Sequence, residues 1–433
     1  MTPQSGFMVV APVAAGREDE LRKLLVSMNR RPGVVDPQNP LVPFGRLDRL
    51  HFSRFVILDD ATLDDVTQHG VPRVDYGLSL AFLADFDGPV DAFLADLLRH
   101  ADQGLRRIFA HCEGFAPDGD LLRWMKAREH RPAASYVNWR GRTVRQIREE
   151  TALRDALVSH LRANAAAIAT MHPGRARDAL VSFVRQEQKA GRLTLTREQP
   201  TPLKWWLRNL AHAVLIPLVG LLLLPLILLY LPIFLIQLRR HERRDPEIVP
   251  RPDADHVRKL TDLEDHDVTN QFSALGTAKP GLFRTFTLGV GLLGLDYAAR
   301  HVYNRGHLTR VSTIHFARWV YLDGKRRLLF ASNYDGSLES YMDDFINKVG
   351  WGLNVVFSNG VGYPHTDYLV MGGAWDEQKF KRYIRRHEQA TELWYNAHPG
   401  LTAVDLVRNT KIRQGVDETS MTDAQARAWL QLL

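Results

Sequence analysis

Three side chains able to do acid–base or ligand chemistry lie in one short segment, NGVGYPHTDYLVMGGA at 359–374: Tyr363, His365 and Asp367. A histidine titrates near neutral pH, so it can act as a general base, and its neutral ring can ligate a metal or haem iron. We therefore take His365 as the first candidate for an axial haem ligand, hence for a metal ligand, or for a general base. Tyr363 is a candidate catalytic residue beside it. The alternatives are a plain glycine-rich loop, or ligation by another histidine: His301, His307, His387 or His398.

Two histidines and two arginines occupy matching positions in two similar segments, DRLHFSRFVILD and STIHFARWVYLD. His51 and Arg54 of the first segment correspond to His315 and Arg318 of the second. A buried arginine needs an acidic partner or an anionic ligand, such as a carboxylate or a haem propionate. His315 and Arg318 are thus candidate cofactor-binding residues, and Arg318 is also a candidate catalytic residue. The alternatives are a hydrogen-bonded core histidine and an intramolecular ion pair.

An Asp-Gly pair ends a predicted strand and precedes a predicted helix twice, at Asp87-Gly88 and at Asp335-Gly336. The structural interpretation is a turn followed by a helix start, because Asp and Gly favour turns and short polar residues cap helices. The functional interpretation is that Asp335 moves a proton during catalysis. Occurrence in both places favours the structural interpretation, because two active sites in one domain would be unusual.

These matches belong to an internal duplication. Residues 48–59 align with 312–323 at an offset of 264, and residues 80–98 align with 328–346 at an offset of 248. Apolar periodicity assigns the same elements to both copies. In the first copy these are strand 7–13, helix 17–29, strands 51–58 and 79–86, helix 90–100 and strand 107–113. In the second they are strand 270–277, helix 283–304, strands 313–322 and 328–334, helix 338–349 and strand 353–358.

The order βαββαβ in each copy is that of a ferredoxin-like unit. Helices cover one face of such a sheet and leave the other face open. Residues 313–322 carry apolar or aromatic side chains on both faces of their strand, so the open face needs a partner sheet. We therefore predict an α+β fold in which two ferredoxin-like repeats face each other and form an intramolecular α/β barrel.

Residues 213–236, AVLIPLVGLLLLPLILLYLPIFLI, form a run of 24 residues without a charge, long enough for one transmembrane helix. A single span would place the two copies on opposite sides of the membrane, where their open faces could not meet. Lys and Arg flank both ends of the run, which suits two cytoplasmic ends. Three prolines interrupt it, with Pro225 at the middle. We predict a re-entrant or in-plane helical hairpin bent near Pro225, with Trp205 and Trp206 at headgroup level; a single span is the alternative.

The sequence thus predicts six segments. They are repeat one (1–117), a basic helical connector (118–200), the apolar membrane anchor (201–245), a polar linker (246–267), repeat two (268–374) and a C-terminal helical tail (375–433). The net charge is +7, and the connector alone holds 16 Lys/Arg against 9 Asp/Glu. A basic segment leading into an apolar one indicates contact with anionic lipid headgroups. Nucleic acid is the rival partner, but no recognition motif accompanies the charge.

Several classes of protein are excluded or disfavoured. Cys112 is the one cysteine, so a disulfide framework or a cysteine-based zinc site is impossible, as suits a reducing compartment. The N-terminus lacks the basic and apolar regions of a signal peptide. No HExxH, Walker A, GxSxG or dinucleotide motif occurs, which argues against zinc proteases, P-loop NTPases, α/β-hydrolases and Rossmann dehydrogenases.

Two ferredoxin-like units with facing sheets resemble the dimeric α/β-barrel superfamily, which includes the dye-decolourising peroxidases, the chlorite dismutases and several small monooxygenases. The resemblance covers 7–117 and 268–364 at the level of element order. The peroxidases carry a GxxDG motif whose Asp works above haem. This chain has the Asp and second Gly of the motif at Asp335-Gly336, but Ser332 stands where its first glycine would fall. The resemblance implies haem as cofactor and Asp335 as a catalytic residue acting on bound peroxide.

Two functions follow as hypotheses. The first is a membrane-surface oxidoreductase on the cytoplasmic face, haem-dependent and peroxidase-like, that takes a lipophilic small-molecule substrate from the bilayer. The second is a non-catalytic lipid-binding or scaffold protein of the same fold, whose barrel is a packed core.

Overall fold

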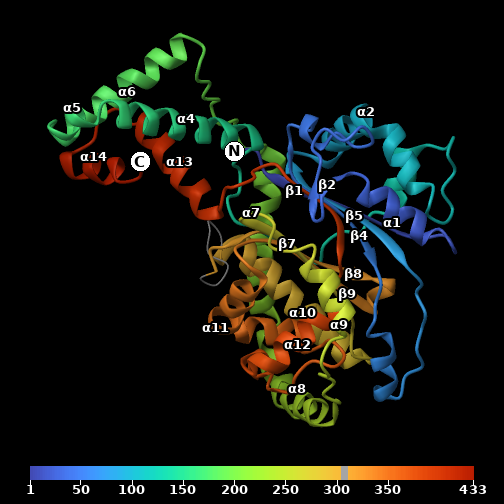
Figure 1. The fold of residues 1–433 in the computed structure, drawn as a ribbon. Helices are drawn as coiled ribbons and strands as arrows, with labels where there is room; N and C mark the ends of the chain where they lie inside the picture. The colour runs from blue at the N-terminus through green and yellow to red at the C-terminus, as the bar shows by residue number, and fades with distance from the viewer. Residues whose placement is uncertain (304–310) are drawn as a thin grey trace.

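The computed structural model describes residues 1–303 and 311–433 and has a mixed α+β architecture with two four-stranded antiparallel sheets (Figure 1). The first sheet holds, in spatial order, β1 (Gln4–Pro12), β5 (Ser79–Asp87), β4 (Leu50–Leu58) and β12 (Thr391–Asn396). The second holds β7 (Thr269–Thr277), β9 (Arg327–Asp335), β8 (Ile314–Leu322) and β6 (Ala134–Val137). Short two-stranded sheets are made by β2 (Asn29–Arg31) with β3 (Val34–Val35), and by β10 (Thr366–Asp367) with β11 (Met371–Gly372).

The first three strands of each sheet were predicted from alternating and continuous apolar runs, and those predictions are confirmed. The registers correspond as well, because β1 starts opposite the end of β5, with Gln4 facing Asp87. In the second sheet β7 starts opposite the end of β9, with Thr269 facing Asp335. Both aspartates therefore lie at the C-terminal end of an interior strand, at corresponding positions in the two sheets.

The fourth strand of each sheet was predicted wrongly. Residues 107–109 and 353–357 instead form the last turns of the helices α2 (Val90–Phe109) and α11 (Leu338–Phe357), and residues 110–113 and 358 follow these helices. Leu97, Ala101, Leu105 and Ile108 are buried and keep helical spacing, so α2 continues as one amphipathic helix. The fourth strands come from elsewhere: β6 follows β1, β4 and β5 in the chain but pairs with β8, and β12 follows β7, β8 and β9 but pairs with β4.

The two sheets pack face to face between two layers of helices. Side chains of β1, β4 and β5 meet those of β7, β8 and β9 in a small apolar layer that includes Val56, Leu83, Val320 and Leu329. The outer face of the first sheet is covered by α1 (Glu18–Val26), α2 and α3 (Leu121–Ala127). The outer face of the second is covered by α10 (Leu282–Tyr297), α11 and α12 (Glu377–His387), and α9 (Ala254–Thr261) precedes β7.

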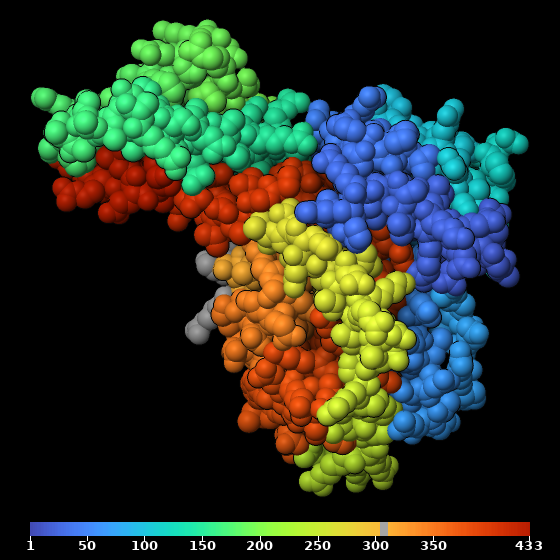
Figure 2. Space-filling view, in the orientation of Figure 1, coloured from blue at the N-terminus to red at the C-terminus, as the bar shows by residue number. Residues whose placement is uncertain are grey.

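A helical arm projects from this body. It contains α4 (Val144–Ala163), α5 (Ala165–Ala169), α6 (Pro173–Lys189), α13 (Ala403–Asp417) and α14 (Asp423–Leu430). Figure 2 shows the green residues of α4 to α6 packed on the red C-terminal helices. A separate apolar cluster holds the arm together, with Leu157 and Val184 against Ile412 and Trp429. The helices α4 and α13 each follow one of the two exchanged strands, so the arm continues from the same edge of the sheets.

The long apolar segment forms α7 (Leu203–Leu222) and α8 (Leu224–Arg244), each long and apolar enough to cross a membrane. Each helix is longer than half of the 24-residue apolar run from which the hairpin was predicted, because both extend into the flanking polar residues. The break between the two helices is at Leu223, two residues before Pro225. The backbone N–H of Leu223 donates to Val219 O, and that of Ile227 donates to Leu223 O, both at 2.9 Å. Helical hydrogen bonding therefore runs through the break, as in a helix kinked by proline.

This kinked helix lies along α10. In the middle of α7, the Ala213 carbonyl oxygen accepts from the Tyr297 hydroxyl at the end of α10. In the middle of α8, Phe234 packs on Phe283 at the start of α10. A tight hairpin bent at Leu223 would bring Ala213 and Phe234 side by side. Their contacts instead lie at opposite ends of α10, which is about 24 Å long. In Figure 1, α7 starts near the N-terminus and α8 reaches the lower edge of the molecule.

Candidate functional site

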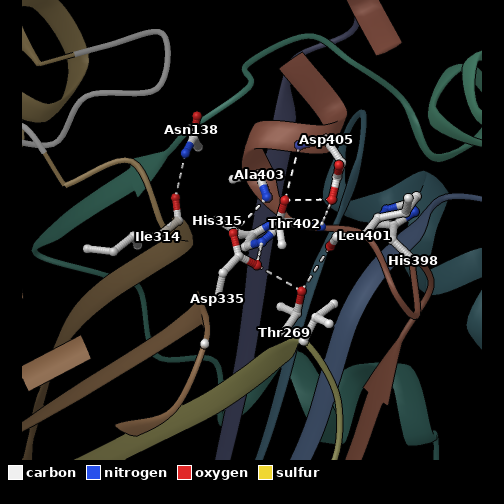
Figure 3. A network of polar contacts seen from close by, with 12 residues as sticks. Asn138, Thr269, Ile314, His315, Asp335, His398, Leu401, Thr402, Ala403 and Asp405 are labelled. Carbon is white, nitrogen blue, oxygen red and sulfur yellow. Dashed lines mark hydrogen bonds and ion pairs between the residues drawn. The ribbon is translucent and has the colours of Figure 1, made fainter. Parts of the chain in front are cut away.

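The buried pair His315–Asp335 is the core of the candidate site (Figure 3). His315 comes from β8 and Asp335 from the end of β9, and the His315 Nε2–Asp335 Oδ1 distance is 2.6 Å. His315 is fully buried, and Asp335 is nearly so. A carboxylate oxygen accepts this hydrogen bond, so His315 donates it from Nε2. Among the described residues, Nδ1 has no hydrogen-bond partner.

The Asp335 carboxylate also holds the start of α13. Its Oδ2 accepts the backbone N–H of Ala403 at 2.7 Å, and its Oδ1 accepts the Thr269 hydroxyl at 2.9 Å. Thr402 caps the same helix in a capping box with Asp405. A carboxylate at a helix N-terminus is stabilised by the free N–H groups and by the helix dipole. The predicted turn at Asp335-Gly336 is therefore a junction of strand, helix start and buried histidine.

The first sheet repeats this arrangement. The Nε2 atom of His51 lies 2.9 Å from Asp87 Oδ1, and Asp87 Oδ2 accepts the backbone N–H of Val144 at 2.8 Å. Val144 begins α4, which Thr143 caps in a second capping box with Gln146. Gly88 and Gly336, which follow the two aspartates, have φ values of 82° and 88°, a conformation that favours glycine. The structural interpretation of the Asp-Gly pairs is thus supported at both sites.

One histidine distinguishes the two pairs. His398, in the loop after β12, places its Nε2 3.0 Å from His51 Nδ1. The three groups form a chain in which His398 donates to His51 and His51 donates to Asp87. Burial, with His51 and His315 nearby, holds the pKa of His398 well below its usual value. His398 is therefore neutral at pH 7, and its own Nδ1 has no partner among the described residues.

Aromatic rings surround these histidines. Trp139 lies 4.8 Å from the His51 ring and 5.9 Å from the His315 ring, measured between centroids. Phe52 and Phe316 complete the cluster between the sheets. None of these rings is exposed. Asp87, which binds His51, lines an open hollow of about 400 Å³ together with Thr143 and Gln146.

The paired arginines bind the opposite sheet. Arg54 donates to the carbonyl oxygens of Phe272 and Ser332 and to the Asn333 side chain. Arg318 donates to the carbonyl oxygens of Phe7 and Ala84 and forms an ion pair with Asp85. Burial lowers the pKa of Arg54 to about 9, against the opposing effect of Asp85. The intramolecular alternative predicted for the arginines is thus what the structure contains.

The loop candidates lie elsewhere. The Tyr363 hydroxyl is buried and donates to Asn354 Oδ1 at 2.8 Å, and burial raises the pKa of Tyr363 well above its usual value. The Nδ1 atom of His365 lies 3.2 Å from the Glu242 carbonyl oxygen at the end of α8. Asp367 of the same loop forms an ion pair with Arg239. The loop therefore binds the end of the apolar helix, and no contact joins it to the His315–Asp335 pair.

A haem does not fit these residues as they stand. Both Asp335 oxygens accept hydrogen bonds within the protein, and the Arg318 guanidinium is occupied by Asp85 and two carbonyl groups. His365 faces α8 and lines none of the cavities found in the described part of the chain. In the same part, no group of three or more His, Cys, Asp or Glu side chains is placed to hold a metal ion.

The other histidine candidates are also engaged. His301 Nε2 lies 2.9 Å from His212 Nδ1, and His387 Nδ1 lies 2.7 Å from the Tyr383 carbonyl oxygen. His307 lies outside the described residues. Trp139 and the helix-start N–H groups were not predicted as site residues. The two capping boxes, visible in the sequence as Thr-x-x-Gln and Thr-x-x-Asp, could have indicated the helix starts.

Comparisons with protein-family models, with curated proteins and with solved structures each found no match. The assignment of a function therefore depends on the geometry of this chain alone.

An apolar cavity lies on the other side of the second sheet. A cavity of about 320 Å³ is walled by α10, by β8 and by the C-terminal half of α11. Its deepest side chains are Trp319, Phe345, Leu353 and Val356, all nearly buried. Among the described residues that line it, none is acidic or basic.

Proposed function

We propose that this protein is a monotopic membrane-surface protein that binds lipid, with two ferredoxin-like repeats that exchange their fourth strands and face each other in an intramolecular α/β barrel. The barrel in this proposal is a packed core that carries the membrane-binding elements. The observation that carries the proposal is the apolar surface that α7 and α8 share with α10. Monomeric soluble proteins rarely expose such large contiguous apolar surfaces.

The outer face of α10 supports the proposal independently of the long apolar run. Leu282, Phe286, Val290 and Leu293 follow one face of this helix and are all exposed, Leu282 by 90%. The kinked helix beside it exposes most of its leucines as well. A structure that lies along α10 rather than projecting from the body suits an in-plane anchor better than a span.

Basic residues flank the anchor at both ends and favour an anionic, cytoplasmic leaflet. Lys204 and Arg208 precede the apolar run, and Arg240 and Arg243 follow it. At the start of α7, the Arg140 guanidinium lies 6.0 Å from the centre of the Trp205 ring. Such amphipathic tryptophans and cations are typical of the membrane–water interface.

Vesicle flotation tests this proposal. The full chain should float with vesicles of phosphatidylcholine that contain phosphatidylglycerol, and less with phosphatidylcholine alone. Replacing Leu282, Phe286 and Val290 by Ser should weaken binding by at least about tenfold, which corresponds to about 1.4 kcal/mol. Val26→Ser, which changes an exposed apolar residue on α1, is the control and should bind as the wild type does.

Protease protection tests the topology. Both halves of the chain should be cleaved from the outside of sealed proteoliposomes, because an in-plane anchor leaves them on one side. Protection of one half only would show a spanning segment and overturn the monotopic proposal.

Haemin titration tests the peroxidase-like alternative. We expect no Soret band that depends on His365, since that side chain faces the end of α8. A haemin-dependent band that disappears in His365→Ala would contradict this expectation and favour the oxidoreductase.

A further inference from the structure

We propose that the cavity between α10 and α11 holds one hydrocarbon chain of a membrane lipid, withdrawn from the bilayer against which α10 lies. The inference rests on the proposed membrane attachment and adds a specific ligand site to it. Three features of the cavity carry it: its lining, its mouth and its glycines.

The lining selects an apolar ligand. The described residues around the cavity are aliphatic, aromatic or glycine, and no charged side chain among them could bind a polar headgroup. A hydrocarbon chain has no polar group, so it can move from the bilayer into such a site without needing a hydrogen-bond partner there. The volume of about 320 Å³ lies at the lower end of small-molecule sites, roughly 300 to 1,000 Å³. That size suits a single chain and is too small for a whole diacyl lipid.

The mouth of the cavity is continuous with the proposed membrane surface. Val290 lines the cavity and is also 53% exposed as part of the outer apolar face of α10. Trp351 lines the cavity from α11 and is 44% exposed. A chain that enters between these two side chains therefore passes from one apolar environment to another without crossing water.

Glycines make room for the chain. Gly291 and Gly294 of α10 both line the cavity. At Gly291 a side chain would press on Val355 of α11, whereas at Gly294 an added Cβ would meet no atom within 4 Å. Gly294 thus faces open space, at a helix position where glycine is less favourable than other residues. A larger side chain there would occupy the cavity without a steric conflict at its Cβ.

Photo-crosslinking with the full chain on vesicles tests the inference. The probe is phosphatidylglycerol with a diazirine at the end of one acyl chain, and the labelled peptides are identified by mass spectrometry. We expect label both on α7–α8, from the bilayer surface, and on residues 349–357 of α11, from the cavity. Gly294→Leu should reduce the label on 349–357 by roughly tenfold and leave the label on α7–α8 unchanged.

Gly289→Leu is the matched control. Gly289 lies on the same helix, and an added Cβ there also meets no atom within 4 Å, but Gly289 does not line the cavity. This variant should keep both labels, and both variants should melt no lower than the wild type. Label on α7–α8 without label on 349–357 in the wild type, or equal loss in the two variants, would overturn the cavity site alone. Absence of label on α7–α8 would instead overturn the membrane attachment.

Discussion

The two histidine–aspartate pairs are built alike, yet their surroundings differ. Each pair joins a central strand, the end of its neighbour and the start of a helix in the arm. In the first sheet His398 extends the pair, and in the second sheet the outer nitrogen of His315 has no partner among the described residues. The shared part is therefore the structural part, which locks the arm to the two sheets.

A similar difference separates the outer faces of the two sheets. The helices on the first sheet present polar outer faces, with acidic and basic residues along α1 and α2. The α10 helix on the second sheet presents Leu282, Phe286 and Val290 to the outside. Two sheets of the same strand order thus differ on the outside: polar helices cover the first sheet, and a helix with an exposed apolar face covers the second.

The two buried arginines, one from each sheet, give the largest expected difference between the two sheets. Arg318 is paired with the charged Asp85, whereas Arg54 meets the neutral Asn333. Arg318→Met leaves the buried Asp85 carboxylate without its ion-pair partner and should reduce the free energy of unfolding by about 3–5 kcal/mol. Arg54→Met removes an arginine whose burial is already unfavourable and should cost about 1–3 kcal/mol. Urea denaturation in a mild detergent measures both, and equal losses would contradict the difference in pairing.

The two aspartates should differ in the same direction but by less. Asp335 accepts three hydrogen bonds, from His315, Thr269 and Ala403, and Asp87 accepts two. Asn cannot accept from all these donors, so Asp335→Asn should cost about 2–4 kcal/mol and Asp87→Asn about 1–3 kcal/mol. Hydrogen exchange should show faster opening of α13 in the first variant and of α4 in the second. Exchange that is unchanged in both helices would show that the pairs do not hold the arm.

Two glycines aligned by the duplication have opposite steric environments. A Cβ on Gly104 of α2 would lie 1.9 Å from the Leu41 carbonyl oxygen, whereas on Gly352 of α11 the nearest atom is Val349 Cγ1 at 3.3 Å. Gly104→Ala should therefore destabilise the protein by about 1–3 kcal/mol. Gly352→Ala should change stability by less than about 1 kcal/mol. The melting temperatures of the two variants test this difference. An unchanged melting temperature in Gly104→Ala would show that the loop at Leu41 moves to make room for the added methyl group.

The smallest expected effect concerns pH. His398 is neutral in the folded chain because its pKa is depressed, whereas in the unfolded chain its pKa is about 6.5. Below that pH the unfolded state binds a proton that the folded state does not, so stability falls as pH falls. One such group contributes a slope of up to about 1.4 kcal/mol per pH unit. Between about pH 6.5 and pH 5, a range set by the reference pKa of histidine, the melting temperature of His398→Gln should fall less than that of the wild type. The control is His100→Gln, which changes an exposed histidine and should fall as the wild type does.

Local pattern was sufficient for most of the central elements. The alternating apolar runs located β1, β4, β5, β7, β8 and β9 to within a few residues, because strand periodicity is a local property. The same reasoning ended α2 and α11 too early. Their later residues suit a strand by composition, and the helical spacing of Leu105 and Ile108 with the preceding turns was the overlooked signal.

The site residues were predicted less well, because a sequence does not state which partners a buried group will have. His315 and Arg318 are buried, as predicted, and Asp335 is buried as well. The partners of Arg318 and Asp335 come from other parts of the chain: Asp85, Ala403 and Thr269. Tyr363 and His365 were grouped with them by chemistry alone, and the structure places them against Asn354 and Glu242.

The sequence by itself determined the α+β composition, the matching strands and the apolar segment, since each depends on residues close together in the chain. Tertiary structure alone decided which sheet receives each fourth strand. ASYV at 134–137 and TELWYN at 391–396 are short, and β pairing depends on which strand edge is free and near. Tertiary structure also decided that the apolar helix lies along α10, because the position of a kinked helix depends on the surface against which it packs.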